Sequence, residues 1–283
     1  MAEGACSGID AFFIPGGSRR LFCVLHRPPR RLACAGAIVY LHPFAEEMNK
    51  SRRMAALQAR ALAAAGWLVL QPDLSGCGDS EGDFGDASWE AWSADACQAV
   101  AWLALESGLR PWLWGLRAGG LLAAAVSAQV PEGADLLLWQ PVLSGKQHLQ
   151  QFLRVKAAGD MLKEDAGPKS ESPRVLLSRG ESIEVAGYRI APGLASGMDA
   201  ASMQLPDSPA TGLARKVVWL EVSSAAQASL SMAAGQVIEK WRAAGWRVLT
   251  QVVQGPAFWQ TLEIEEAPAL IEASLGLIGG PTA

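Results

Sequence analysis

Charged residues of either sign are scarce in this sequence, and histidine is scarcer still. Lys and Arg number 24, Asp and Glu 28, and His 3, which gives a formal net charge of −4 over 283 residues. No cluster of Lys or Arg supplies the basic surface that binding to nucleic acid or to an anionic membrane requires. No uninterrupted apolar run reaches the ~18 residues that cross a bilayer. We therefore expect neither a nucleic-acid partner nor a membrane span.

Cysteine is too sparse and too irregular for a structural framework. The five cysteines form no C-x-x-C pair, which argues against disulfide pairing and against a zinc site. The first ten residues lack a basic segment followed by an apolar one, so no signal peptide is visible. No phosphate-cradling glycine motif and no set of metal ligands is present. We expect a cytoplasmic protein without a cofactor or metal.

Short apolar runs alternate with helical patterns along most of the chain. Half of the residues are hydrophobic, enough for a large buried core. Strands alternating with helices imply a mostly parallel sheet covered on both faces. A hairpin with a Gly16-Gly17 turn comes first. The predicted strands are 11–14, 21–25, 37–41, 67–70, 111–114, 134–139, 216–222 and 246–253, and the predicted helices are 53–65, 88–106, 119–129, 227–244 and 263–275.

The alternation stops between residues 146 and 209. This stretch is irregular and rich in Gly, Ser and Pro, with a helix expected over 147–157 and a strand pair over 174–177 and 182–186. A structureless loop of roughly 60 residues is unusual in a compact domain. We therefore expect residues 1–145 and 210–283 to form the core, and residues 146–209 to form a lid over the carboxyl edge of the sheet.

Four segments fall where the predicted strands end, which is where sites on such sheets lie. They are His42-Pro43-Phe44, the D-x-x-G-x-G-x-S stretch 73–80, Gly115-Leu116-Arg117-Ala118-Gly119, and the loop after Val253. Their order and spacing resemble the α/β-hydrolase superfamily, in which they would be the oxyanion loop, the D-x-x-G-x-G-x-S loop, the nucleophile elbow and the histidine loop. The resemblance implies an α/β-hydrolase fold with an eight-stranded sheet and an inserted lid.

Three further stretches resemble a narrower group. Residues 43–54, 140–145 and 258–260 are similar to the hydrolase 2 group associated with the exosortase A system. This resemblance implies a bacterial setting at exopolysaccharide and protein-sorting loci. It implies a hydrolase of the ester or acyl class only by homology.

The elbow departs from the family pattern because Arg117 stands where a serine belongs. A guanidinium cannot be deprotonated and cannot attack a carbonyl. After residue 207 the sequence contains no His and no Asp, and Gln140 follows the strand at which an acid could stand. Glu221 could take the place of the acid, but it has no histidine to orient. Loss of the serine or the histidine typically costs on the order of 10⁶ in rate, so we expect a pseudoenzyme with no imidazole within reach of Arg117.

Arg117 therefore needs another explanation. A cation in strained backbone at a helix N-terminus is costly unless an anion accompanies it. That anion could be Glu46 or Glu47 on the neighbouring loop, or a ligand carboxylate or phosphate, and both could occur together. The residues expected around such a ligand are Phe44, Ala45, Ala118, His42, Gln140 and Trp259.

Three functions stay open at this point. The first is a non-hydrolytic or cryptically active homologue that binds a small anionic or acyl-bearing molecule. The second is an ester or thioester hydrolase or acyltransferase in which Glu46 or Glu47 activates water beside Arg117. The third is an interaction subunit, with a protein partner or a second copy of the chain. A carboxylate of raised pKa beside an open cavity favours the second, and a filled pocket with Arg117 fully paired favours the third.

Other reactive side chains have structural explanations. His42 belongs to the oxyanion loop, His26 ends a strand, and His148 near the lid is expected at the surface or in packing. Cys77 lies between two glycines of a turn, where a small residue is needed, although it is the one alternative nucleophile. Asp73 and Asp79 are expected to accept hydrogen bonds from backbone amides of their loop.

The first prediction concerns the vacant nucleophile position. Arg117→Ser restores the hydroxyl but, because we expect no base near it, the variant should not hydrolyse p-nitrophenyl esters. Release of p-nitrophenol is measured against the unchanged protein. Turnover by the variant above that baseline would show that a base is present after all.

Overall fold

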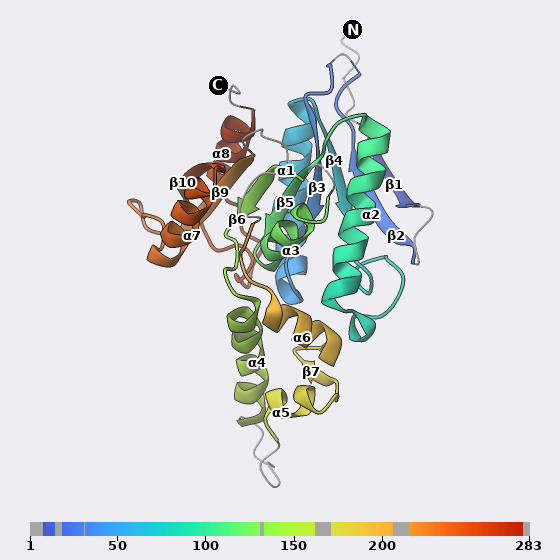
Figure 1. Ribbon diagram of the computed structural model, residues 1–283, viewed down its shortest axis with the longest axis vertical. Coiled ribbons are helices and arrows are strands. Elements are labelled where there is room, and N and C mark those ends of the chain that lie inside the picture. Colours follow the sequence, from blue (N-terminus) through green and yellow to red (C-terminus); the bar gives the residue numbers. More distant parts are fainter. Residues whose placement is uncertain are drawn as a thin grey trace.

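One eight-stranded sheet forms the centre of the molecule (Figure 1). The computed structural model describes residues 8–14, 19–30, 32–130, 133–161, 171–205 and 215–279. The strand order is β1-β2-β4-β3-β5-β6-β9-β10; β2 is antiparallel to both neighbours, and all other pairs are parallel. The strands are β1 (Ile9–Ile14), β2 (Leu21–His26), β3 (Gly36–Leu41), β4 (Trp67–Pro72), β5 (Trp112–Leu116), β6 (Leu136–Trp139), β9 (Lys216–Ser223) and β10 (Arg247–Gln254). The predicted fold is confirmed, whereas the Gly16-Gly17 turn lies outside the described residues.

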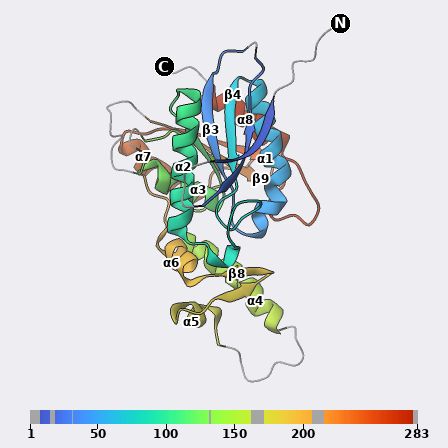
Figure 2. The same ribbon diagram turned by 90° about the vertical axis from the view of Figure 1, so that its right-hand side faces the viewer.

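Helices cover both faces of the sheet, so each face has its own core. Alternate residues of β3 divide between the two cores: Val39 and Leu41 pack on the first, and Ile38 and Tyr40 on the second. In Figure 2, α2 and α3 lie on one side of the sheet and α1 on the other. The first core is covered by α2 (Trp89–Ser107), α3 (Ala118–Ser127) and α7 (Met232–Ala243), and the second by α1 (Glu46–Ala64) and α8 (Pro268–Ile278). No helix in the described residues is long and apolar enough to cross a membrane.

Tryptophan rings fill the centre of the sheet. Trp114 on β5 and Trp139 on β6 are fully buried, and their ring centroids lie 4.8 Å apart. The indole N–H of Trp139 donates a 2.8 Å hydrogen bond to Ser274 Oγ on α8, which satisfies a buried polar group and ties the helix to the sheet. These rings are part of the core of the molecule.

The segment between β6 and β9 lies beyond the carboxyl ends of the parallel strands (Figure 1). Its apolar side chains Leu149, Phe152, Leu194 and Met198 join the core that α2 and α3 cover. The two chains that connect it to the sheet pair with each other through a bridge between Ser144 and Ser202. Its elements are α4 (Gly145–Met161), α5 (Pro173–Ser178), β7 (Ile183–Val185), β8 (Tyr188–Ile190) and α6 (Pro192–Ala200).

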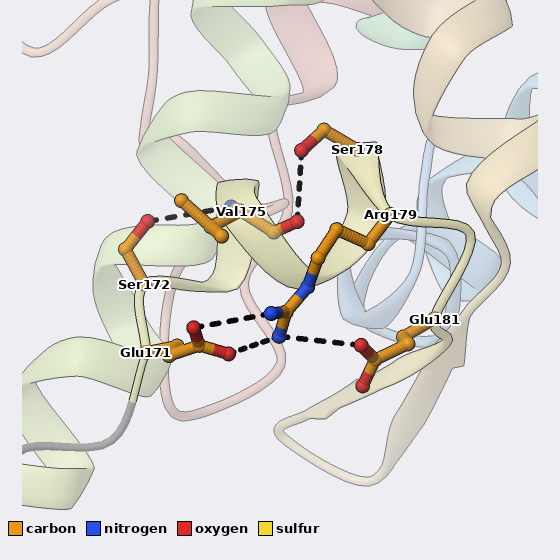
Figure 3. Close-up of polar contacts among 6 residues, drawn as sticks. All are labelled: Glu171, Ser172, Val175, Ser178, Arg179 and Glu181. Atoms are coloured by element: carbon orange, nitrogen blue, oxygen red, sulfur yellow. Dashed lines mark hydrogen bonds and ion pairs between the residues drawn. The ribbon is translucent and has the colours of Figure 1, made fainter.

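The prediction of a strand over residues 174–177 is wrong, because these residues form α5. Ser172 caps the helix by accepting from the Val175 amide, and Pro173 occupies its first turn. A short apolar run fits a strand or a buried helix equally well, and here the helix-start residues decide. Arg179 at the end of α5 pairs with Glu171 and Glu181 (Figure 3). The partner of β7 is β8, which follows it directly.

Helix starts also differ from those expected. The helix expected from residue 53 begins at Glu46, directly after the loop of residues 42–45. The last two helices begin later than expected, at Met232 after the capping Ser231 and at Pro268. The sequence carries both of these later signals, a serine cap and a proline in the first turn.

Two glycines make the turn between β5 and α3 possible. A Cβ on Gly119 would lie 2.1 Å from the Leu41 carbonyl oxygen, and one on Gly115 would lie 2.4 Å from the Gly119 carbonyl oxygen. The backbones of β3, β5 and α3 therefore approach more closely than any side chain allows. This contact holds Arg117 at the carboxyl edge of the sheet.

The second prediction tests this close approach. Gly119→Ala should lower the free energy of unfolding by about 1–3 kcal/mol, because the added methyl meets rigid backbone. Gly235→Ala in α7 is the matched control: no atom lies within 4 Å of its added Cβ, and alanine there should raise stability by about 0.5–1 kcal/mol. Urea denaturation measures both. Equal effects of the two substitutions would contradict the steric argument.

Candidate functional site

Backbone strain is concentrated at the carboxyl ends of three neighbouring strands. Ala45, Arg117 and Gln140 adopt φ angles of 52°, 54° and 40°, and they follow β3, β5 and β6. A non-glycine residue in this region costs about 1–3 kcal/mol and persists only where the surrounding structure enforces it. All three positions were candidate site residues, and the structure brings them to one edge of the sheet.

A cavity of about 240 Å³ opens at this edge, between the sheet and α4. Five of the residues proposed from the sequence line it: Phe44, Glu46, Glu47, Arg117 and Trp259. The other lining residues are Lys50, His148, Gln151, Phe152 and Gln260. The cavity therefore combines cations, carboxylates and aromatic walls.

Arg117 is held by one carboxylate and one ring. Its Nε donates a 3.1 Å hydrogen bond to Glu47 Oε1, and its guanidinium carbon lies 5.4 Å from the ring centroid of Trp259. The expected internal ion pair is thus formed, and Glu47 rather than Glu46 provides it. Nη1 and Nη2 make no hydrogen bond to any described residue. The side chain is 14% exposed, so most of it is removed from solvent while part stays open to the cavity.

Glu47 is a buried carboxylate with an unusual pKa. Burial raises its pKa to about 7, against the lowering effect of the charge and hydrogen bond of Arg117. Its Oε1 accepts from Arg117, whereas its Oε2 is buried without a hydrogen-bond partner in the described part of the chain. A carboxyl group in this state changes its protonation near neutral pH.

The expectation that no imidazole lies within reach of Arg117 is wrong. His148 on α4 is buried beside the cavity, with Nε2 3.8 Å from Glu47 Oε2 and its ring 6.1 Å from that of Phe44. Burial, followed by the charge of Arg117, lowers the pKa of His148 to about 4. The imidazole is therefore neutral at pH 7, and His148 and Glu47 are two bases near Arg117 that the prediction for Arg117→Ser did not consider. Sequence reasoning missed it because α4 folds back over the sheet edge, a contact between residues far apart in the chain.

Four of the expected ligand residues do not line the cavity: His42, Ala45, Ala118 and Gln140. His42 instead makes contacts within its loop: its Nδ1 lies 2.9 Å from the Pro43 carbonyl oxygen, and its Nε2 lies 3.4 Å from the Leu74 amide nitrogen. Gln140 Oε1 accepts a 2.8 Å hydrogen bond from the Val222 amide and so braces the end of β9.

Most of the cavity residues that were not predicted from the sequence share a spacing of three or four positions from another cavity residue. Lys50 follows Glu46 and Glu47 by three or four positions on α1, and Gln151 and Phe152 follow His148 by the same intervals on α4. Residues so spaced lie on one face of a helix. One residue known to face the cavity on each helix would have identified the others.

The other candidate groups lie away from this chemistry. Cys77 is buried and its pKa is raised to about 12, first by burial and then by the charge of Asp73, so it carries no thiolate at neutral pH. Asp73 Oδ2 accepts from the Asp79 amide at 3.0 Å, the loop role expected of it. Glu221 accepts a hydrogen bond from the Trp219 indole. Among the described residues, no group of three or more His, Cys, Asp or Glu side chains could hold a metal ion.

Comparison with known proteins supports the fold that the strand order describes. The family model for "Serine aminopeptidase, S33" matches residues 33–180, just over half of the chain. No curated protein sequence matches the chain.

Solved structures resemble the chain along nearly its whole length. Est1E from Butyrivibrio proteoclasticus, with ferulic acid bound, has a TM-score of 0.64 at 15% identity, covering 95% of this chain and 100% of its own. A hypothetical protein from Pseudomonas aeruginosa has a TM-score of 0.59 at 15% identity, with 98% and 96% covered. A lidless member of the α/β serine hydrolases from Xanthomonas campestris has a TM-score of 0.53 at 14% identity, with 95% and 93% covered. At these identities the likeness shows the α/β-hydrolase fold alone.

The third prediction concerns Glu47 and pH. Because its folded-state pKa lies above its ordinary value of 4.5, its contribution to stability is present at low pH and is lost as pH rises through about 7. The free energy of unfolding, relative to that of Glu47→Gln, should therefore fall by on the order of 1–3 kcal/mol between pH 5 and 8. His148 acts with the opposite sign at lower pH and is present in both proteins. A difference that grows with pH would mean that Arg117 outweighs burial.

Proposed function

Since this chain belongs to the serine aminopeptidase S33 family, and thus to the α/β-hydrolase superfamily, we propose that it uses the hydrolase site to bind a small carboxylate or acyl-bearing molecule. The observation that carries the proposal is Arg117 at the strained turn where the fold exposes a nucleophile. The position that would attack an acyl carbon holds a permanent cation instead. Such a group attracts a carboxylate and performs no acyl transfer itself.

The cavity supplies the contacts that a small organic anion needs. Nη1 and Nη2 of Arg117 have no hydrogen bond to a described residue, and a guanidinium can hold a carboxylate through two parallel bonds. Lys50 adds a second cation to the lining, and Phe44, Phe152 and Trp259 add apolar walls. Small-molecule sites commonly combine apolar walls with few fixed polar groups. An aryl or acyl carboxylate therefore matches both the charge and the walls.

The lid and the setting are part of the same proposal. Residues 146–209 would act as a lid over the core of residues 1–145 and 210–283, since α4 contributes His148, Gln151 and Phe152 to the cavity. The resemblance to the exosortase A-associated group supports a role in the bacterial cytoplasm at exopolysaccharide loci. An open cavity argues for a ligand over a purely protein-binding subunit.

A second candidate is a hydrolase or acyltransferase in which Glu47 is the general base and Arg117 stabilises an oxyanion. The raised pKa of Glu47 beside the cavity favours it. Access is the difficulty, because Oε1 is occupied by Arg117 and Oε2 is buried. Turnover of p-nitrophenyl esters by the unchanged protein, abolished in Glu47→Gln, would favour this candidate over binding alone.

The fourth prediction tests anion recognition. Benzoate should bind the unchanged protein, and Arg117→Met should weaken binding by roughly 10- to 100-fold, the value of a charge-assisted hydrogen bond. Isothermal titration calorimetry measures Kd, and circular dichroism checks the fold. Arg60→Met, on the exposed surface of α1, should bind benzoate normally. Benzamide bound as tightly as benzoate, or an unaffected Arg117→Met, would contradict recognition of an anion.

A further inference from the structure

The charges around Glu47 balance before any ligand arrives. Arg117 faces it from the turn before α3, Glu46 and Lys50 belong to its own helix, and His148 faces it from α4. The phenyl ring of Phe44 and the indole of Trp259 line the same cavity without adding charge. His148 is neutral, so the lining holds two cations and two carboxylates. A ligand carboxylate adds a third negative group to this set.

The ligand carboxylate and the Glu47 carboxylate would share one cation, the guanidinium of Arg117. Both would lie against Arg117, Glu47 on Nε and the ligand on the two terminal amino groups. Two carboxylates in such proximity cannot both stay ionised at ordinary cost, and the pKa of one of them rises strongly. Glu47 is the one already desolvated, whereas the ligand takes the bidentate position that stabilises an anion.

Building on the proposed function, we infer that a carboxylate ligand binds at Arg117 together with one proton, which is held on Oε2 of Glu47. The step balances as ligand carboxylate, plus Glu47 carboxylate, plus one proton from solvent, giving ligand carboxylate beside a neutral Glu47 carboxyl group. No covalent bond other than the new O–H forms or breaks. The Arg117 charge is then matched by the ligand, and Glu47 Oε1 still accepts from Nε.

Two features of the structure assign the proton to this atom. Oε2 is buried 3.8 Å from His148 Nε2 and has no hydrogen-bond partner in the described residues, so a proton there displaces no existing bond. Burial has already raised the pKa of Glu47 and lowered that of His148, so the carboxyl group takes up a proton before the imidazole does.

Because ligand binding is coupled to proton uptake, the direction in which Kd changes with pH is fixed. Below a pH of about 7, Glu47 of the free protein is already protonated and affinity does not change with pH. Above it, each bound ligand must take up a proton, so Kd rises about tenfold per pH unit. Ligand is therefore held in mildly acidic conditions and released in alkaline ones.

The fifth prediction uses benzoate and the full-length protein. Isothermal titration calorimetry at pH 8 in two buffers of different ionisation enthalpy should show close to one proton taken up per benzoate, and Kd should rise about tenfold per unit from pH 7.5 to 9. In Glu47→Gln, proton uptake should vanish and Kd should be flat over this range. Glu46→Gln is the matched control: it removes the adjacent carboxylate of the same lining, and proton uptake should remain. Neutral benzamide should show no proton uptake.

Three other outcomes of the calorimetry would each contradict a different part of the proposal. Benzoate binding with no proton uptake and a flat Kd in the unchanged protein would overturn the linkage and leave the anion site standing. Proton uptake that persists in Glu47→Gln would overturn the assignment to Glu47. Failure of benzoate to bind the unchanged protein and Glu47→Gln at any pH from 6 to 9 would overturn the proposed function, and the linkage with it.

Discussion

The site depends on the ion pair between Arg117 and Glu47. Each partner is costly alone: the guanidinium stands in strained backbone at the positive end of a helix, and the carboxylate is withdrawn from water. Together they form one ion pair, in which Arg117 Nε lies 3.1 Å from Glu47 Oε1 and joins the end of β5 to α1. Removing either partner would strand a charge in a poorly solvated place. The pair is therefore the constraint within which any chemistry at this edge of the sheet must operate.

The hydrolase fold keeps its architecture with an arginine at the turn between β5 and α3. The close approach at Gly115 and Gly119 still forms the sharp turn, and Arg117 has the backbone angles that this turn imposes. The turn presents a guanidinium at the position where the superfamily pattern has a serine. A backbone shaped to expose a nucleophile also exposes a cation well.

Much of the fold could be predicted from the sequence, because buried parallel strands are continuous apolar runs and the segments between them have helical spacing of apolar residues. Arg117 and its neighbours Glu46 and Glu47 could be predicted as well, since the turn between a strand and a helix fixes where they lie. His148 could not, because its position depends on how α4 packs against the core, and this is set by long-range burial of Leu149 and Phe152. Residues 174–177 were misjudged for a related reason, since a short apolar run has no periodicity of its own.

The bridge between Ser144 and Ser202 has a consequence for how the protein can change over evolution. Ser144 and Ser202 lie side by side, so the segment between these two residues behaves as an insertion with joined ends. β6 and β9 are direct neighbours in the sheet, and their pairing does not pass through that segment. Substitutions in α4 can therefore reshape one wall of the cavity while the opposite wall stays fixed. The α4 wall of the cavity and the pairing of β6 with β9 are therefore encoded in different stretches of the gene.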